Sequence, residues 1–187
     1  MSKTRKITTS ALLVALATVL MLLSKLIPSM PWGGSVTLAS MVPLIVLSLM
    51  LGTKWGIFAG GVYALIQMLT GFYPPPTQTF PDFILVVVLD YLLAFGILGI
   101  AAWFYRMFGK KLWAIPLSGL LVTMLRYLCH ILSGILIWGV YAEEGQTVLA
   151  YSLLYNGSYM IPEIILTTAV LALFSGFLQK WLTRSQY

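Results

Sequence analysis

The chain has 187 residues, of which 60% are hydrophobic and only 9% are charged, whereas an ordinary soluble domain carries about 25% charged residues. This composition, with a mean hydropathy of +0.96, excludes a soluble globular exterior and a disordered chain, and it indicates a protein whose solvent is lipid. The net charge of +6 does not indicate a nucleic-acid partner, because the basic residues stand between apolar segments. The single cysteine, Cys129, excludes an intramolecular disulfide.

Six apolar segments follow one another along the chain, each bounded by charged residues, proline or glycine. They predict helices at about residues 8–27, 37–52, 55–71, 83–106, 113–141 and 149–179. The second and third segments are short for a membrane span of about 20 residues, which leaves three alternatives: little tilt, a shared tight turn at Gly52-Thr53-Lys54, or a position where the protein is thin. No repeat or polar linker divides the chain, so the predicted fold class is an all-α membrane protein, a six-transmembrane-helix bundle forming one integral membrane domain over residues 1–187.

The basic residues predict the orientation, since Lys and Arg are retained in cytoplasmic loops. With a cytoplasmic N-terminus, nine of the eleven basic residues fall on the cytoplasmic side, and the acidic loop residues Asp82, Glu143 and Glu144 fall outside with Lys25. The sequence therefore predicts a multi-pass protein of the cell membrane with both termini cytoplasmic. The nine residues are Lys3, Arg5, Lys6, Lys54, Arg106, Lys110, Lys111, Lys180 and Arg184.

The first helix and the outer loops contain the first candidate functional residues along the chain. Ala11 and Ala15 are four residues apart, a spacing that allows close approach of another helix, either within this chain or from another subunit. The loops after the first and third helices contain Trp32 and Tyr73 among prolines and glycines. These stiff, aromatic loops form either a lid or simple turns.

Charged residues within the apolar segments are a stronger signal, because a charge at the centre of a membrane helix costs at least about 2.5 kcal/mol. Asp90 lies eight residues after Asp82, hence roughly 12 Å into the fourth helix, and should face the bundle interior. Arg126 and His130 are four residues apart on the fifth helix and project from one face. Trp138, two turns further outward, can border the same cavity.

The sixth helix carries a polar stripe. Ser152, Asn156, Tyr159 and Glu163 recur at spacings of four, three and four residues, so they share one face. In lipid this face would leave polar groups without partners, so it must face other helices or a water-filled pocket. The polar residues of the last three helices together suit an aromatic, hydrogen-bonding and cationic small molecule.

A purely structural role is the alternative for each of these residues. Arg126 could form an internal ion pair with Asp90 or Glu163, and Asn156 could join two helices by hydrogen bonds. Trp138 alone is typical of an anchor at the membrane surface. The coincidence of several ionisable residues within the membrane favours a binding site.

The sequence lacks the residues that several activities require. No G-x-x-x-x-G-K-[ST] sequence is present to cradle the phosphates of ATP, so any ATP-driven step requires a partner. With one histidine and one cysteine, a zinc site is not expected, and no cofactor is predicted. A small membrane enzyme that uses Asp90 and His130 stays open, although no nucleophile stands beside an activating base.

Three spaced motifs carry a resemblance to a known family. They are Leu89-Asp90-Tyr91, Leu125-Arg126-Tyr127-x-x-His130-x-x-Ser133-Gly134 and Tyr151-Ser152-Leu153-x-x-Asn156, with Pro31-x-Gly33-Gly34-Ser35 upstream. On these motifs, nearly the whole chain resembles the thiamine-specific substrate-binding subunits (S-components) of ECF-type vitamin importers. The resemblance implies a membrane protein, not itself an enzyme, that captures thiamine at the outer face and works with a transmembrane coupling subunit and two ATPase subunits.

The resemblance also implies roles for individual residues. Asp90 and Tyr91 match the pair that holds the polar or cationic parts of the ligand, and His130 matches a histidine that lines the pocket. Trp138 matches a stacking aromatic residue, and Arg126 matches a basic position one turn below the histidine. The remaining matches are Tyr151 and Asn156 as hydrogen-bonding residues, Ala11 and Ala15 as the contact face for the coupling subunit, and Tyr63 as a position where some members carry Trp.

Thiamine also suits these residues on chemical grounds, because it is a permanent cation with an aminopyrimidine ring, a thiazolium ring and a hydroxyl group. Asp90 supplies opposite charge, and cation–π contact with Trp138 or a tyrosine would contribute about 0.5 to 2 kcal/mol. The alternatives are an S-component for another vitamin or pyrimidine precursor, a small membrane enzyme, or a structural bundle. Further candidates for the substrate site are Trp32, Tyr63, Tyr73, Ser152 and Glu163, the last either pairing with Arg126 or extending the site.

Overall fold

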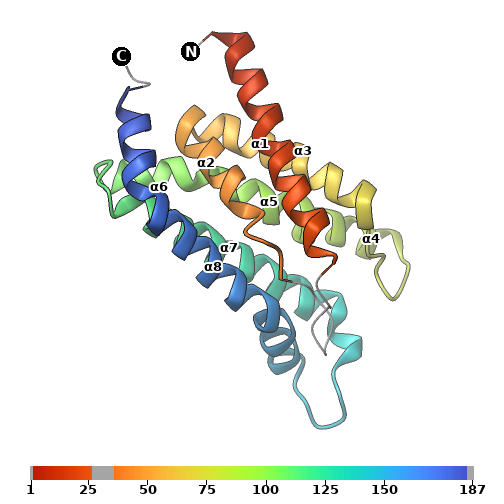
Figure 1. The fold of residues 1–187 in the computed structure, drawn as a ribbon. Coiled ribbons are helices and arrows are strands. Elements are labelled where there is room, and N and C mark those ends of the chain that lie inside the picture. The colour runs from red at the N-terminus through yellow and green to blue at the C-terminus, as the bar shows by residue number, and fades with distance from the viewer. Residues whose placement is uncertain (1, 27–35, 185–187) are drawn as a thin grey trace.

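The protein is all-helical in the computed structural model, which describes residues 2–26 and 36–184 and has no strand within them (Figure 1). Six helical stretches coincide with the six predicted apolar segments, which confirms the all-α fold class. They are α1 (Lys3–Ser24), α2 (Met41–Leu51), α3 (Thr53–Gly71), a composite stretch over residues 80–107, α7 (Ala114–Leu136) and α8 (Val148–Arg184).

The composite stretch is not a regular α-helix. A π-helical turn inside an α-helix is rare and occurs often at functional sites, and here that turn contains Asp90 and Tyr91. The 3-10 turn further along is stabilised by Ser48 of α2, whose hydroxyl donates to the carbonyl of Gly99 (2.5 Å) and accepts from the N–H of Ala102 (3.1 Å). The parts of the stretch are α4 (Phe80–Val86), the π-helical turn η1 (Val87–Leu93), α5 (Ala94–Gly96), the 3-10 turn η2 (Ile97–Ile100) and α6 (Ala101–Met107).

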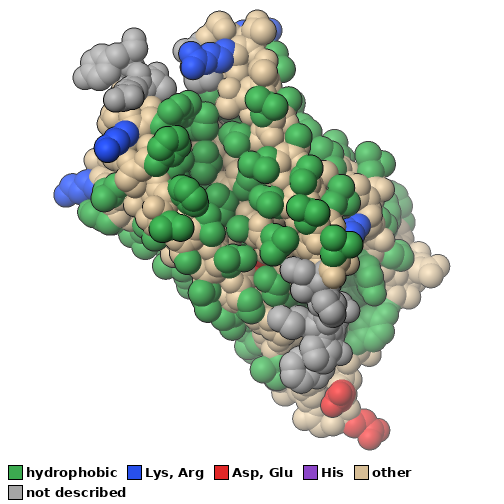
Figure 2. All heavy atoms as spheres, viewed as in Figure 1, with side chains coloured by type: hydrophobic (Ala, Val, Ile, Leu, Met, Phe, Trp, Pro, Cys, Tyr) green, Lys and Arg blue, Asp and Glu red, His purple; other side chains and the backbone are tan. Residues whose placement is uncertain are grey.

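Four of these stretches are long and apolar enough to cross a membrane, namely α1, the composite stretch, α7 and α8. Large hydrophobic side chains are exposed along the outside of the bundle (Figure 2), as expected of surfaces that meet lipid tails. The chain is therefore a multi-pass membrane protein. The total of six crossings stays a prediction.

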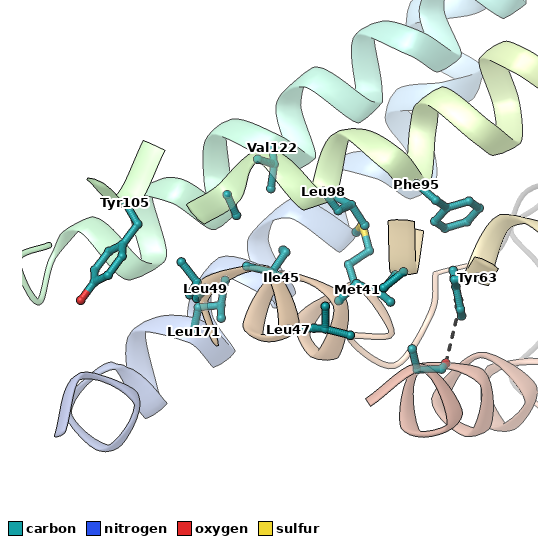
Figure 3. Close-up of a cluster of buried hydrophobic side chains, with 14 of the residues drawn as sticks. Met41, Ile45, Leu47, Leu49, Tyr63, Phe95, Leu98, Tyr105, Val122 and Leu171 are labelled. Carbon is teal, nitrogen blue, oxygen red and sulfur yellow. Dashed lines mark hydrogen bonds between the residues drawn. The ribbon is translucent and has the colours of Figure 1, made fainter. Parts of the chain in front are cut away.

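The shortness of α2 is explained by its burial. Seven of its eleven residues are buried, and it packs against α1, α3, α6 and α8. Figure 3 shows Met41, Ile45 and Leu47 of α2 beside Leu98 and Leu171 from other parts of the chain. A helix that is apolar on all sides is a core element, so α2 fills the centre of the bundle.

The linker between α2 and α3 is shorter than the predicted turn. Gly52 alone joins the two helices. Its φ is +92°, a backbone conformation that residues other than glycine rarely adopt. Thr53 and Lys54 already belong to α3. The tight turn considered from the sequence is therefore present, but it consists of Gly52 alone and not of three residues.

Both ends of the chain lie at the same end of the bundle, where α1 begins and α8 ends (Figure 1). On the visible face, most Lys and Arg side chains gather at this end, and acidic side chains project from the opposite end (Figure 2). Such an asymmetry is typical of a membrane protein with its basic end in the cytoplasm. The cytoplasmic location of the termini itself stays a prediction.

Close packing of α3 against the composite stretch yields a test of the fold. A Cβ atom at Gly60 would lie 2.9 Å from the carbonyl carbon of Phe95, whereas one at Gly61 would meet nothing within 4 Å. We expect Gly60→Ala to lower the free energy of unfolding by about 1–3 kcal/mol through overpacking. The neighbouring Gly61→Ala should be neutral or slightly stabilising. Thermal unfolding in detergent measures both, and equal stability of the two variants would contradict this packing.

Candidate functional site

A cavity of about 1000 Å³ lies among the helices at the end of the bundle opposite the chain termini. Its walls come from α1, α3, η1, α7, α8 and the 3-10 turn η3 (Trp138–Tyr141). The volume is at the upper end of the range for small-molecule sites, about 300–1,000 Å³. The predicted residues that line it are Tyr73, Asp90, Tyr91, Arg126, His130, Trp138, Tyr151, Asn156 and Glu163.

The carboxylate of Asp90 is held by three side chains. Its Oδ1 lies 3.0 Å from Nδ1 of His130, and its Oδ2 accepts hydrogen bonds from the hydroxyl of Ser133 (2.6 Å) and the indole N–H of Trp138 (3.2 Å). The π-helical turn places Asp90 on the wall that faces α7. Sequence reasoning missed Ser133 as a partner, because a serine on an apolar helix gives no signal of its own.

A second set of contacts orients His130. Arg126, one turn below it on α7, donates from Nε to Nε2 of His130 (3.3 Å), so the ring proton belongs on Nδ1, facing Asp90. The guanidinium carbon of Arg126 also lies 4.2 Å from the centre of the Phe95 ring. Among the described residues Arg126 forms no ion pair with Asp90 or Glu163. The structural ion pair considered from the sequence is therefore not formed.

Aromatic side chains form the wall next to Asp90. Trp138 was predicted to continue the fifth helix, but α7 ends at Leu136 and Trp138 begins the short turn η3. The ring of Trp138 stacks on Tyr141 with centroids 6.4 Å apart and lies 6.0 Å from Tyr73. The turn thus points the indole toward Asp90 and leaves flat aromatic surface along the cavity.

The polar stripe of α8 forms another wall. The amide nitrogen of Asn156 donates to the carbonyls of His130 (3.1 Å) and Ser152 (3.0 Å), and the hydroxyl of Tyr159 donates to its amide oxygen (2.7 Å). Asn156 therefore joins α7 to α8 and also lines the cavity. Tyr155, which sequence reasoning did not single out, lines the cavity and stacks on Tyr151 with centroids 5.7 Å apart.

Two candidates from the sequence lie outside the cavity wall. Ser152 is fully buried and donates to the carbonyl of Ile131 (2.8 Å), so it serves helix packing. Tyr63 is also fully buried, packs edge-on against Phe95, and bonds the carbonyl of Ala17 (Figure 3). Neither side chain is part of the cavity lining, and contact of either one with a substrate stays a prediction. Trp32 lies outside the described residues.

Asp90, His130 and Ser133 are the residue types of a catalytic triad, but their hydrogen bonds differ from those of a triad. In a triad the histidine lies between the serine and the carboxylate, so that it can take the serine proton. Here the hydroxyl of Ser133 and the ring of His130 both bind the same carboxylate. The arrangement fixes Asp90 and does not activate Ser133 as a nucleophile.

A multi-pass helical bundle with a polar, aromatic cavity of this size defines a membrane protein that binds or transports a small organic molecule. Comparison with known protein families identifies the family to which this membrane protein belongs. The chain belongs to the family described as thiamine transporter protein (Thia_YuaJ), whose model matches residues 7–182. This confirms the resemblance found in the sequence, and it makes the protein a transporter and not an enzyme.

Individual relatives agree with this assignment. The chain is 33% identical over 174 residues to the thiamine transporter ThiT of Bacillus subtilis, covering 87% of this chain and 86% of that protein. It is 26% identical over 139 residues to ThiT of Lacticaseibacillus paracasei, covering 70% of this chain and 68% of that protein. The solved structure of ThiT from Listeria monocytogenes has the same fold, with a TM-score of 0.75, 20% identity, and coverage of 96% of this chain and 98% of that chain.

Proposed function

We propose that the protein binds thiamine with high affinity from the outer face of the cell membrane and acts as the S-component of an ECF-type importer. The observation that carries the thiamine assignment is the carboxylate of Asp90, fixed by three donors beside the indole of Trp138 in the cavity wall. A fixed carboxylate among aromatic faces suits a delocalised organic cation. The names of the family and of its ThiT relatives support the same ligand.

The charges of the cavity wall favour one positive charge on the ligand. Two basic and three acidic side chains line the cavity and leave a formal charge of −1, which one thiamine cation would neutralise. Charge pairing strengthens where a site is partly removed from water, so neutral or anionic vitamins would bind less well. The five side chains are Lys25, Asp90, Arg126, Glu143 and Glu163.

The importer requires partners because the sequence has no motif of its own for binding ATP. We propose a transmembrane coupling subunit and two ATPase subunits as these partners. Ala11 and Ala15 are exposed on α1, and small residues four apart let a second helix approach closely. The cavity lies at the end opposite the basic termini, which supports capture from outside the cell.

Titration of the detergent-purified protein tests the proposed function. We expect thiamine to quench tryptophan fluorescence saturably at submicromolar concentrations, because Trp138 lines the cavity. Riboflavin and pyridoxine should have no effect, and calorimetry should give one site without conversion of the ligand. Binding of another vitamin in place of thiamine would mean that a protein of this fold transports a different ligand. No binding at all would overturn the assignment.

A further inference from the structure

A shallow groove lies at the start of α3, on the outside of the bundle and apart from the cavity. Its volume is about 280 Å³, and it is lined by Lys54, Trp55 and Phe58. The rings of Trp55 and Phe58 meet edge-on with centroids 6.2 Å apart, and Lys54 is exposed beside them. The groove therefore combines a positive charge with aromatic surface, and the proposed thiamine site does not use it.

A second basic side chain lies next to this groove. Arg106, in the last turn of α6, donates from Nη2 to the hydroxyl of Thr53 (3.0 Å), the residue before Lys54. The composite stretch packs closely on α3 here, because a Cβ atom at Gly99 would lie only 2.6 Å from the Cα atom of Ile57. Lys54 and Arg106 thus form one basic patch, which this packing fixes in place.

Among the described residues, no acidic side chain balances the basic patch. The ion pair found there joins His130 to Asp90, and neither Lys54 nor Arg106 has a carboxylate partner. The acidic residues of the chain lie instead in the cavity wall, in the loop after η3 and at the start of α4. Basic side chains at a membrane surface attract anionic headgroups, so the patch is suited to an anion. The acidic residues are Asp82, Asp90, Glu143, Glu144 and Glu163.

Apolar surface continues from the groove along one face of α3. Phe58, Gly61 and Leu65 follow Lys54 at spacings of four, three and four residues, so they share its face. Phe58 and Leu65 are exposed, and a Cβ atom at Gly61 would meet nothing within 4 Å. From Phe58 to Leu65 this strip is about 10 Å long, within the roughly 15 Å of hydrocarbon in one leaflet. A charged head and an apolar tail can therefore bind along one line.

We propose that this face binds an anionic phospholipid, with its phosphate at Lys54 and Arg106 and an acyl chain along the strip over Gly61. Arg and Lys are the side chains that bind phosphate groups in proteins. A protein partner fits less well, because a stable interface covers about 800 Å² on each partner and helices that associate in lipid present small residues. Here the groove has only three lining residues, and Phe58 and Leu65 are bulky.

Native mass spectrometry of the detergent-purified protein tests the proposal, with dioleoylphosphatidylglycerol and dioleoylphosphatidylcholine present at equal concentrations. One phosphatidylglycerol should bind at least about tenfold more tightly than phosphatidylcholine, because two basic side chains face a net negative headgroup. Millimolar inorganic phosphate should not displace it, since free phosphate has no acyl chain to bury. The double variant Lys54→Gln, Arg106→Gln should retain a preference of about twofold or less.

The matched control is the double variant Arg5→Gln, Lys180→Gln, which removes the same two residue types from the same end of the bundle. Arg5 on α1 and Lys180 on α8 are exposed, and neither lines the groove. This variant should keep the preference within about twofold of the unaltered protein. Equal losses in the two double variants would overturn the proposal, because the preference would then follow net charge alone.

The single variant Lys54→Gln separates lipid binding from folding, because it leaves the hydrogen bond between Arg106 and Thr53 in place. It should lower the preference at least about threefold without changing the thermal unfolding midpoint in lipid-free detergent. An unchanged preference in this variant would overturn the proposal. Equal binding of the two lipids by the unaltered protein, or displacement of the lipid by inorganic phosphate, would overturn it as well.

Discussion

Replacing Asp90 by asparagine should lower the affinity for thiamine by about 100–1000-fold, equivalent to about 3–4 kcal/mol. The substitution removes the negative charge that faces the cation in a site partly removed from water. It also replaces one carboxylate oxygen with an amide N–H. That donor would face another donor, either His130 or the pair Ser133 and Trp138, depending on which oxygen is replaced. Calorimetry on the purified variant measures the loss, and the thermal unfolding midpoint shows whether the variant is folded.

Asp82→Asn is the matched control for this change. Asp82 lies at the start of the same composite stretch, accepts hydrogen bonds from Thr77 and Thr79, and is not part of the cavity wall. Its substitution should leave thiamine affinity within about twofold, because an exposed charge outside the site is screened. If both variants bound thiamine like the unaltered protein, or if Asp90→Asn lost only stability, Asp90 would have no place in binding.

The regular features of the fold could be predicted from the sequence because they follow from solvation. Apolar runs bounded by glycine, proline and charge gave six helices that the structure confirms. The three charged residues predicted inside them, Asp90, Arg126 and Glu163, line one cavity, since each would otherwise face lipid. Ser152 was the exception on the α8 stripe. It shares a face with Asn156, but its hydroxyl donates to the carbonyl of Ile131. Periodicity alone does not show whether a polar side chain on this face packs against another helix or lines a cavity.

The irregular backbone of the site could not be predicted in this way. A π-helical turn at Asp90 and a 3-10 turn at Trp138 together bring the carboxylate within 3.2 Å of the indole nitrogen. Counting residues along ideal helices cannot find such a contact, because each turn shifts the angle at which a side chain projects. The burial of Tyr63 was missed for a related reason. It depends on the close approach of α3 to Phe95, which glycines on both stretches permit.

Bulky substitutions at Ala11 and Ala15 should separate binding from transport. The double variant Ala11→Trp, Ala15→Trp should bind thiamine within about twofold of the unaltered protein, because neither residue lines the cavity. Thiamine uptake into cells should fall more than about tenfold, because helix-to-helix contact in lipid depends on small residues that allow close approach. Uptake of labelled thiamine in cells that carry the energising subunits, with calorimetry on the same variants, measures the two effects.

The control for this prediction is Ala172→Trp. Ala172 is also a small exposed residue on a helix that faces lipid, in the half of α8 near the chain termini. It should reduce neither binding nor uptake, since added apolar bulk in contact with lipid costs little. Normal uptake by the α1 double variant would remove α1 as the docking surface. Loss of uptake by Ala172→Trp as well would mean that bulk on any outer face impairs transport, and the partner contact would then have to be sought elsewhere.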